Sequence, residues 1–194
     1  MASQLQPTHP LQSRLENLAG LPDGFQVTAD PFLTMTVLRS QPGGPATTAV
    51  IALLGVTPPT QPNTWVQGPT GRIVWLGPDD WLVISDLGVM DTQEADLRAA
   101  VVPHGGAAVD VSGQRILLTL RGRHLRDVLA KGCALDLHPR VLKAGASAQT
   151  TLGQAGIVLL ARDDPDEFTI LVRQSFANYL ADWFVDAALE FGAE

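Results

Sequence analysis

The chain has 194 residues, of which 45% are hydrophobic and only 17% are charged, and its formal net charge is −7. A chain of this length suits one domain that buries about 70% of its unfolded surface, so the core needs no disulfide or metal to hold it. The negative charge argues against DNA or RNA as a partner, because phosphate groups would be repelled.

Cysteine usage and hydropathy bear on the cellular compartment. Cys133 is the only cysteine, so an internal disulfide cannot form, which suits a reducing cytoplasm. No apolar run approaches the ~20 residues of a membrane span. The first twenty residues lack the apolar core of a signal peptide. We therefore expect a cytoplasmic protein with no membrane partner.

The first third of the chain contains short elements separated by stiff connections. Residues 12–20 could form a short helix, limited by the flanking prolines and Gly20. Alternating and β-branched residues predict a strand over 32–38, and an apolar run predicts a second strand over 50–54. The Pro- and Gly-rich segments 40–48 and 57–64 predict loops.

A β-hairpin followed by a helix is predicted next. Residues 72–76 and 81–85 are apolar strands on either side of Gly77-Pro78-Asp79-Asp80, which supplies turn chemistry. Asp91 is placed to cap a helix that runs to about Val101, with acidic residues in its first turn.

The second half alternates strands with two helices. Helices are predicted over 123–130, ended by Gly132, and from Ser175 as a cap to the C-terminus. The predicted strands are 107–111, 115–120, 150–152, 156–161 and 167–172.

The last helix carries one apolar stripe. Its members recur every three or four residues, which is the pattern of a helix face packed on a core. They are Phe176, Tyr179, Leu180, Trp183, Phe184 and Ala187.

Residues 72–101 and 156–191 share the order hairpin then helix, which predicts an α+β fold made of a duplicated unit of antiparallel strands with packed helices. The absence of alternating βαβ units argues against a doubly wound parallel sheet. The predicted boundaries are an N-terminal extension at 1–24 and a single domain at 25–194, with pseudo-repeats at about 25–105 and 106–194.

Two pairs of residues could carry chemistry, but structural roles are favoured for both. Asp79 and Asp80 could form an acid–base pair, yet neighbouring side chains point apart and both residues suit a hairpin turn. Cys133 and His138 could form a nucleophile pair, yet a cysteine after a helix is more often a small apolar plug. The chain has no metal-ligand spacing and no glycine-rich dinucleotide or phosphate loop.

Basic residues gather in the middle of the second half, whereas the C-terminal part is acidic. The basic group could dock an acidic partner or line a pocket for a polyanion, or it could simply pair with the acidic residues of the same domain. We slightly favour docking. The basic residues are Arg115, Arg121, Arg123, Arg126, Lys131, Arg140 and Lys143, and the candidate interface consists of Arg121, Arg123, Arg126, Lys131 and Arg140.

Several segments, in their order and spacing, resemble the gamma subunit of heterotetrameric sarcosine oxidase. The resemblance covers about the last two thirds of the chain, mainly residues 109–188. The matching segments are WLGPDDWLVIS from Trp75, VDVS from Val109, KGCALDLHP from Lys131, AQTTLG from Ala148 and SFANYLADWFVDAA from Ser175.

The resemblance implies a non-catalytic subunit whose fold is related to the folate-binding domain of the glycine-cleavage T-protein. It implies a complex that oxidatively demethylates sarcosine to glycine, makes hydrogen peroxide from oxygen and passes the one-carbon unit to tetrahydrofolate. It also implies alpha, beta and delta subunits as partners, chiefly alpha. FAD, FMN, NAD, tetrahydrofolate and zinc would be bound by those other subunits, and no cofactor by this chain.

Two alternatives remain open from the sequence. The chain could be a stand-alone folate-dependent aminomethyltransferase-like protein, in which case Asp110 is the candidate base. It could also be an accessory subunit of an oxidase that acts on another N-methyl amine.

Overall fold

The computed structural model describes residues 8–86, 88 and 92–192. Within these residues the strands form two five-stranded sheets in which all pairings are antiparallel. The predicted α+β class with antiparallel sheets is therefore confirmed. The first sheet, called sheet A, has the order β1-β7-β10-β9-β8, and the second, called sheet B, has the order β3-β4-β5-β2-β6.

The bounds of the elements are as follows. The strands are β1 (Gln26–Ala29), β2 (Met35–Arg39), β3 (Trp65–Gln67), β4 (Gly71–Gly77), β5 (Asp80–Ser85), β6 (Ala107–Asp110), β7 (Arg115–Arg121), β8 (Ser147–Leu152), β9 (Ala155–Ala161) and β10 (Glu167–Arg173). The α-helices are α1 (Leu15–Ala19), α2 (Thr47–Leu54), α3 (Gln93–Val101), α4 (Leu125–Ala130) and α5 (Ala177–Ala188).

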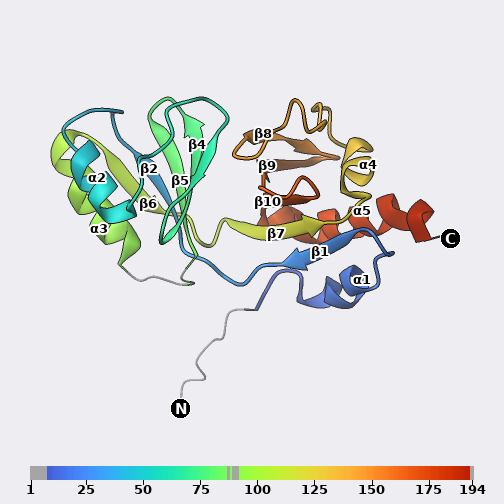
Figure 1. The fold of residues 1–194 in the computed structure, drawn as a ribbon. Helices are drawn as coiled ribbons and strands as arrows, with labels where there is room; N and C mark the ends of the chain where they lie inside the picture. Colours follow the sequence, from blue (N-terminus) through green and yellow to red (C-terminus); the bar gives the residue numbers. More distant parts are fainter. Residues whose placement is uncertain (1–7, 87, 89–91, 193–194) are drawn as a thin grey trace, which may run out of the picture.

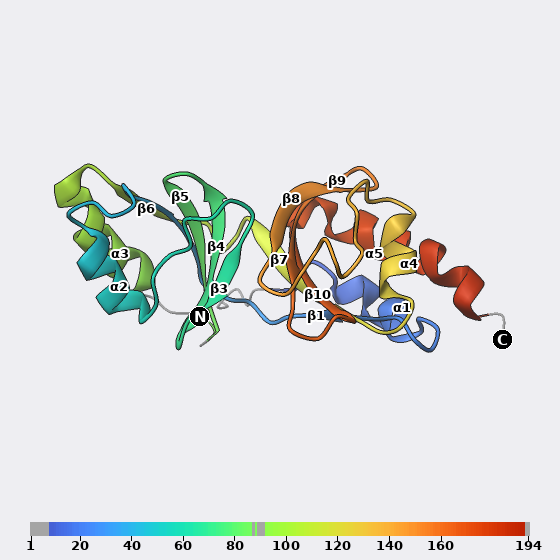
Figure 2. The ribbon, with the colours of Figure 1, turned by 45° about the horizontal axis from the view of Figure 1, so that its top comes forward.

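The elements form four layers, with helices on the outside and the two sheets in the middle (Figure 1). Helices α2 and α3 cover the outer face of sheet B, and α1, α4 and α5 cover the outer face of sheet A (Figure 2). Side chains from the two inner faces, among them Leu82, Ile84, Leu117 and Leu171, form a third apolar cluster between the sheets. Because strand residues alternate between faces, each sheet is apolar on both sides.

The two sheets are not built from consecutive halves of the chain. β1 pairs with β7 in sheet A, and β6 pairs with β2 in sheet B. The chain therefore crosses between the sheets twice, once after β1 and once between β6 and β7. At the second crossing, Ser112 binds the backbone N–H of Met35 through its hydroxyl oxygen, 2.9 Å away. The predicted division into pseudo-repeats at about residue 105 does not coincide with a boundary between sheets, and the duplication itself stays a prediction.

The predicted strand over residues 50–54 is wrong, because these residues belong to helix α2. Val50 and Leu54 lie one helical turn apart and are both buried against the outer face of sheet B. The helix ends at Gly55, whose φ of 68° is the left-handed conformation that glycine adopts without strain. A short β-branched, apolar run suits a buried helix as well as a strand, and packing on the sheet decides between them.

The hairpin at Gly77–Asp80 and the strands of the second half are confirmed to within a few residues. Two predicted helix caps have different outcomes. Ser175 does not cap α5, because it lies inside a 3-10 turn, and the residue at the cap position, Phe176, makes no side-chain capping bond. Asp91 lies outside the described residues, and α3 begins at Gln93.

The apolar stripe of the last helix is core, as predicted, although its centre is shifted. Leu180, Phe184 and Ala187 are buried against sheet A. Tyr179 is 36% exposed, and its hydroxyl accepts a hydrogen bond from the Gln154 backbone N–H at 3.0 Å. The buried face also includes Ala177, Ala181 and Ala188, whose small side chains let the helix lie close to the sheet.

Candidate functional site

The inner face of sheet A carries a charged cleft at the end of the interface between the sheets. We call it the paired-charge cleft; it has a volume of about 330 Å³. Arg72 of β4 donates from Nε to Asp86 Oδ1 at 2.9 Å, and its Nη2 lies 2.7 Å from the same oxygen. Arg121 of β7 donates to Glu167 Oε2 at 2.8 Å, and Arg162 Nε lies 3.6 Å from Glu167 Oε1. Each guanidinium that lines this cleft therefore has a carboxylate within 4 Å.

Asp30 lies in the same cleft, where the chain leaves β1 to cross into sheet B. Burial raises the pKa of the Asp30 carboxyl above its ordinary value, and a hydrogen bond from Thr119 Oγ1, at 3.1 Å, opposes that shift. The positive charges of the surrounding arginines oppose it further. The sequence gives no local signal for this cleft, because its residues come from five separated parts of the chain that only the packing of the sheets brings together.

The ion pairs of the paired-charge cleft each lie within one sheet, Arg72–Asp86 in sheet B and Arg121–Glu167 in sheet A. Arg72 and Arg121 are hydrogen-bonded to carboxylates of this chain, and Arg162 lies 3.6 Å from Glu167 with its buried Nη1 atom lacking an acceptor among the described residues. Among the described residues that line it there is no cysteine, serine or histidine; its two hydroxyl-bearing side chains are Thr119, which donates to Asp30, and Thr169. A nucleophile with its base, the minimum for covalent catalysis, is therefore not assembled there.

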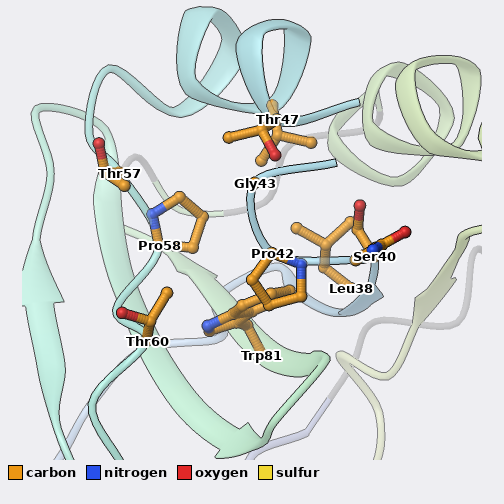
Figure 3. Close-up of a pocket in the computed structure, with 11 residues that line it drawn as sticks. Leu38, Ser40, Pro42, Gly43, Thr47, Thr57, Pro58, Thr60 and Trp81 are labelled. Carbon is orange, nitrogen blue, oxygen red and sulfur yellow. The ribbon is translucent and has the colours of Figure 1, made fainter. Parts of the chain in front are cut away.

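A second hollow lies on the outer side of sheet B and is apolar (Figure 3). Its walls are the loop at 40–43, the start of α2, the Pro-rich segment at 57–60 and the ring of Trp81. Trp81 is fixed by a hydrogen bond from its indole Nε1 to the Pro59 carbonyl oxygen at 2.7 Å. The volume of about 40 Å³ suits one water-sized or methyl-sized group, whereas sites for drug-sized ligands and cofactors take several hundred Å³.

Asp79 and Asp80 occupy the hairpin turn, as the sequence predicts. The Arg39 guanidinium donates from Nε to Asp79 Oδ2 at 3.0 Å and lies 4.0 Å from Asp80 Oδ1. Both carboxylates thus face a cation on the neighbouring strand β2, which is a structural role and not that of an acid–base pair.

Cys133 and His138 likewise have structural surroundings. Cys133 is 7% exposed and belongs to the core beneath α5. His138 is exposed, and its Nδ1 accepts a hydrogen bond from the Arg140 backbone N–H at 3.1 Å. The core packing of the thiol supports the apolar-plug interpretation.

Asp110, the candidate base, lies at the end of β6 on the surface. Its Oδ1 accepts hydrogen bonds from the Ser112 hydroxyl at 2.5 Å and from the Ser112 backbone N–H at 2.8 Å. These bonds lower the pKa of the Asp110 carboxyl, which is opposite to the direction that a general base at neutral pH requires.

Four of the five candidate interface residues have side-chain contacts with other residues of this chain. Arg121 pairs with Glu167 in the paired-charge cleft. The Arg126 guanidinium donates to the carbonyl oxygens of Leu137 and Pro165 and lies over the Phe168 ring, 4.8 Å from its centroid. Lys131 donates to the Ala187 carbonyl oxygen and lies 2.6 Å from Glu190 Oε1.

Arg123 and Arg140 are exposed, as are Arg121 and Lys131. Arg123 contacts the His124 ring from its Nε at 3.0 Å. Arg140 is exposed in the turn that follows Pro139. The structure therefore leaves the docking surface a prediction, centred on the segment that carries Arg140.

The described residues also bear on metal binding and on membrane insertion. Within 8–86, 88 and 92–192, no three His, Cys, Asp or Glu side chains gather closely enough to hold a metal ion. In the same part of the chain, each helix is too short or too polar to cross a bilayer.

Sequence comparison gives several relatives. The model of the family described as "Sarcosine oxidase, gamma subunit family" matches residues 39–190. The sarcosine oxidase subunit gamma of Corynebacterium sp. (strain P-1) is 34% identical over 164 residues, which are 84% of this chain and 79% of that one. The protein of the same name from Arthrobacter sp is 33% identical over 163 residues, with the same shares of both chains.

Structure comparison agrees with the sequence. A chain of heterotetrameric sarcosine oxidase from Corynebacterium sp. U-96, in complex with pyrrole 2-carboxylate, has a TM-score of 0.87 and 28% identity over 97% of both chains. The glycine cleavage system aminomethyltransferase T from Bartonella henselae has a TM-score of 0.63 and 13% identity, over 89% of this chain and 48% of that one. The second likeness shows the fold alone and confirms the predicted relationship to the aminomethyltransferase fold.

Proposed function

We infer the role of this chain from the premise that it belongs to the sarcosine oxidase gamma subunit family. We propose that it is the gamma subunit of a heterotetrameric sarcosine oxidase and that it takes no direct part in bond making or breaking. The observation that carries the proposal is the match to a chain of the Corynebacterium sp. U-96 complex over nearly the whole length of both chains.

The proposed complex oxidises sarcosine to glycine and reduces oxygen to hydrogen peroxide, and tetrahydrofolate accepts the one-carbon unit. FAD, FMN, NAD, tetrahydrofolate and zinc are assigned to the other subunits. The antiparallel pairing of both sheets supports this assignment for the dinucleotides, because their usual site requires a parallel βαβ unit with a glycine turn at the start of the helix.

The non-catalytic role is supported by the geometry of the charged groups. In the paired-charge cleft, Arg72 and Arg121 form ion pairs with Asp86 and Glu167. The pKa of the Asp110 carboxyl is lowered, whereas a general base at neutral pH needs a raised one. These groups are engaged within the chain, so the chain is proposed to act as a partner surface. The alpha subunit is its proposed principal partner, with beta and delta completing the assembly.

The test is reconstitution with and without this chain. Co-expression of all four subunits is expected to yield one complex that forms hydrogen peroxide when sarcosine is added, and the purified single chain is expected to form none. The proposal would be overturned by turnover of sarcosine by the single chain, or by failure of the single chain to purify with the other three.

The two alternative functions are each tested by a measurement of their own. An aminomethyltransferase-like protein would bind tetrahydrofolate tightly as an isolated chain, which isothermal titration calorimetry measures. The match to the aminomethyltransferase covers only 48% of that protein, which disfavours this alternative. An accessory subunit of another oxidase would give a complex that prefers a different N-methyl amine to sarcosine, which a comparison of kcat/KM values detects.

A further inference from the structure

Two arginines face each other at the end of sheet A opposite to the paired-charge cleft. Arg115 of β7 and Arg173 of β10 are direct partners in the antiparallel ladder. Arg115 is two residues from Leu117 on β7, and Arg173 is two residues from Leu171 on β10. Both leucines pack between the sheets. Because residues two apart on a strand share a face, both arginines lie on the inner face of sheet A. Like charges directly opposite each other on neighbouring strands are destabilising.

No carboxylate of the described residues neutralises this pair. Neither guanidinium has an acidic oxygen within 4.0 Å, in contrast to Arg72, Arg121 and Arg162 at the other end of the same interface. The Arg115 Nη1 atom is shielded from solvent and has no hydrogen-bond partner. Burial, and then the charge of Arg173, lower the pKa of Arg115, as expected for a cation without a counter-ion. A buried donor without an acceptor destabilises the folded chain.

The pair opens onto a groove of about 300 Å³ that has room for a ligand. Its walls include Val158, Leu171 and Gln149, whose amide donates to the Leu76 carbonyl oxygen at 2.9 Å. Gly156 forms part of the wall, and a Cβ atom built on it would meet no atom within 4 Å. The groove thus combines two unpaired guanidinium groups with neutral, partly apolar walls.

We propose that the Arg115–Arg173 groove is a carboxylate-binding site and that its occupant is an acidic side chain from a partner subunit of the complex. This inference rests on the proposed function, because it requires a partner. Guanidinium groups bind carboxylates through two parallel N–H···O bonds, and such charge-assisted bonds are about twice as strong as neutral ones. A partner residue explains why the chain itself supplies no counter-charge: the cost exists only before assembly, and association removes it.

The first test removes the cations in the complete assembly. Arg115→Gln and Arg173→Gln, singly and together, are co-expressed with the other three subunits, and the dissociation of this chain is measured over a range of salt concentrations. The double variant is expected to bind at least tenfold more weakly and with less dependence on salt. An affinity within twofold of the unaltered chain overturns the site.

The second test adds a carboxylate to the groove from within the chain. Gly156→Glu is compared with Gly156→Gln, which has the same size and no charge. The glutamate is expected to raise the melting temperature of the chain above that of the Gln variant, because it neutralises the arginines. It is also expected to weaken association with the other subunits by at least tenfold, because it takes the place of the partner's carboxylate. Equal melting temperatures and equal affinities in the two variants overturn the proposal even where the arginine variants fold poorly.

A third experiment distinguishes two possible occupants of the groove, an acidic side chain of a partner and a free small carboxylate. Succinate is titrated into the unaltered chain and into the double arginine variant. Stabilisation of the unaltered chain alone by micromolar succinate, together with normal assembly of the double variant, would assign the groove to a metabolite and overturn the partner assignment. If the unaltered chain does not assemble at all, the proposed function fails together with the occupant inferred from it. If the unaltered chain assembles and the variants assemble with the same affinity, the groove proposal fails and the proposed function stands.

Discussion

The Arg72 guanidinium lies 2.7 Å from the Asp86 carboxylate and is almost completely enclosed where β4 faces sheet A. Asp86 also accepts a hydrogen bond from the Gln67 amide at 2.8 Å. The ion pair therefore ties β4 to the end of β5 and closes one side of the paired-charge cleft.

Arg72→Met is expected to lower the free energy of unfolding by about 2–3 kcal/mol, because it removes charge-assisted hydrogen bonds and leaves the Asp86 carboxylate with one donor. The loss is smaller than for a fully buried pair, since the Asp86 side chain is 35% exposed. Urea unfolding measures the change. The matched control is Arg98→Met, whose partner Glu94 is 3.5 Å away at the surface and which should change stability by less than about 0.5 kcal/mol. Equal effects of the two substitutions would show that the cleft adds no stability.

Gly71 is a position where a side chain does not fit. A Cβ atom there would lie 2.0 Å from the Ile84 carbonyl oxygen, which is backbone and cannot rotate away. Gly71→Ala is expected to force β4 from β5 and to lower stability by about 1–3 kcal/mol, or roughly 3–10 °C in melting temperature. Gly113→Ala is the control, because a Cβ at that position meets no atom within 4 Å. If Gly71→Ala and Gly113→Ala had the same melting temperature, the close approach of β4 to β5 at Gly71 would be refuted.

Local chemistry made some elements predictable from the sequence. The residues of the turn at Gly77–Asp80 favour a turn, and strands β7, β9 and β10 of sheet A are strongly apolar, so the sequence predicts these elements. It does not predict β1, a four-residue strand with little apolar pattern of its own. The segment 47–54 was not, because its apolar run has no local feature that separates a buried helix from a strand.

The arrangement of charges could not be predicted, since it depends on how distant segments pack. Asp30, Arg72 and Glu167 meet only because β1 joins the sheet formed mainly by the second half of the chain. The sequence predicts a basic cluster only because these residues are close together along the chain. The structure distributes it over separate surroundings: Arg126 against carbonyl oxygens, and Arg115 on the opposite end of β7 from Arg121.

The pKa values of Asp30 and Asp110 are displaced in opposite directions from the ordinary value of 3.8. Burial raises the pKa of Asp30, so the folded state binds this proton more readily than the unfolded state does. The carboxyl therefore costs stability as the pH rises from 3.8 through its folded pKa. Hydrogen bonds from Ser112 lower the pKa of Asp110, so that group contributes stability above pH 3.8, which is lost as the pH falls through its folded pKa.

The two asparagine variants should consequently have opposite pH dependence. Relative to the unaltered chain, Asp30→Asn is expected to gain stability as the pH rises from 3 to 7, and its amide oxygen can still accept from Thr119. Asp110→Asn is expected to lose stability over the same range. Urea midpoints measured at one-unit intervals give both slopes, and curves parallel to that of the unaltered chain would refute the assigned environments.

Arg140 and Arg126 were predicted together as interface residues, but the structure makes only Arg140 a clean test of docking. The Arg126 guanidinium satisfies two carbonyl oxygens and covers the Phe168 ring, so Arg126→Glu should destabilise the chain itself. The Arg140 side chain is exposed, and only its backbone N–H is bound, to His138.

Arg140→Glu is therefore expected to leave the melting temperature within about 2 °C, as surface substitutions usually do. If the segment docks on an acidic partner, the same substitution should weaken assembly at least tenfold, most strongly at low salt, because opposed surface charges attract over about 10 Å at 0.1 M salt. Arg98→Glu on α3, a reversal of the same sign remote from this segment, controls for the change in net charge. A pull-down titration compares the assembly of the two variants. Equal assembly would show that the segment around Arg140 is not part of the interface. The alternative, that the basic residues pair with acidic residues of the same domain, would then be favoured.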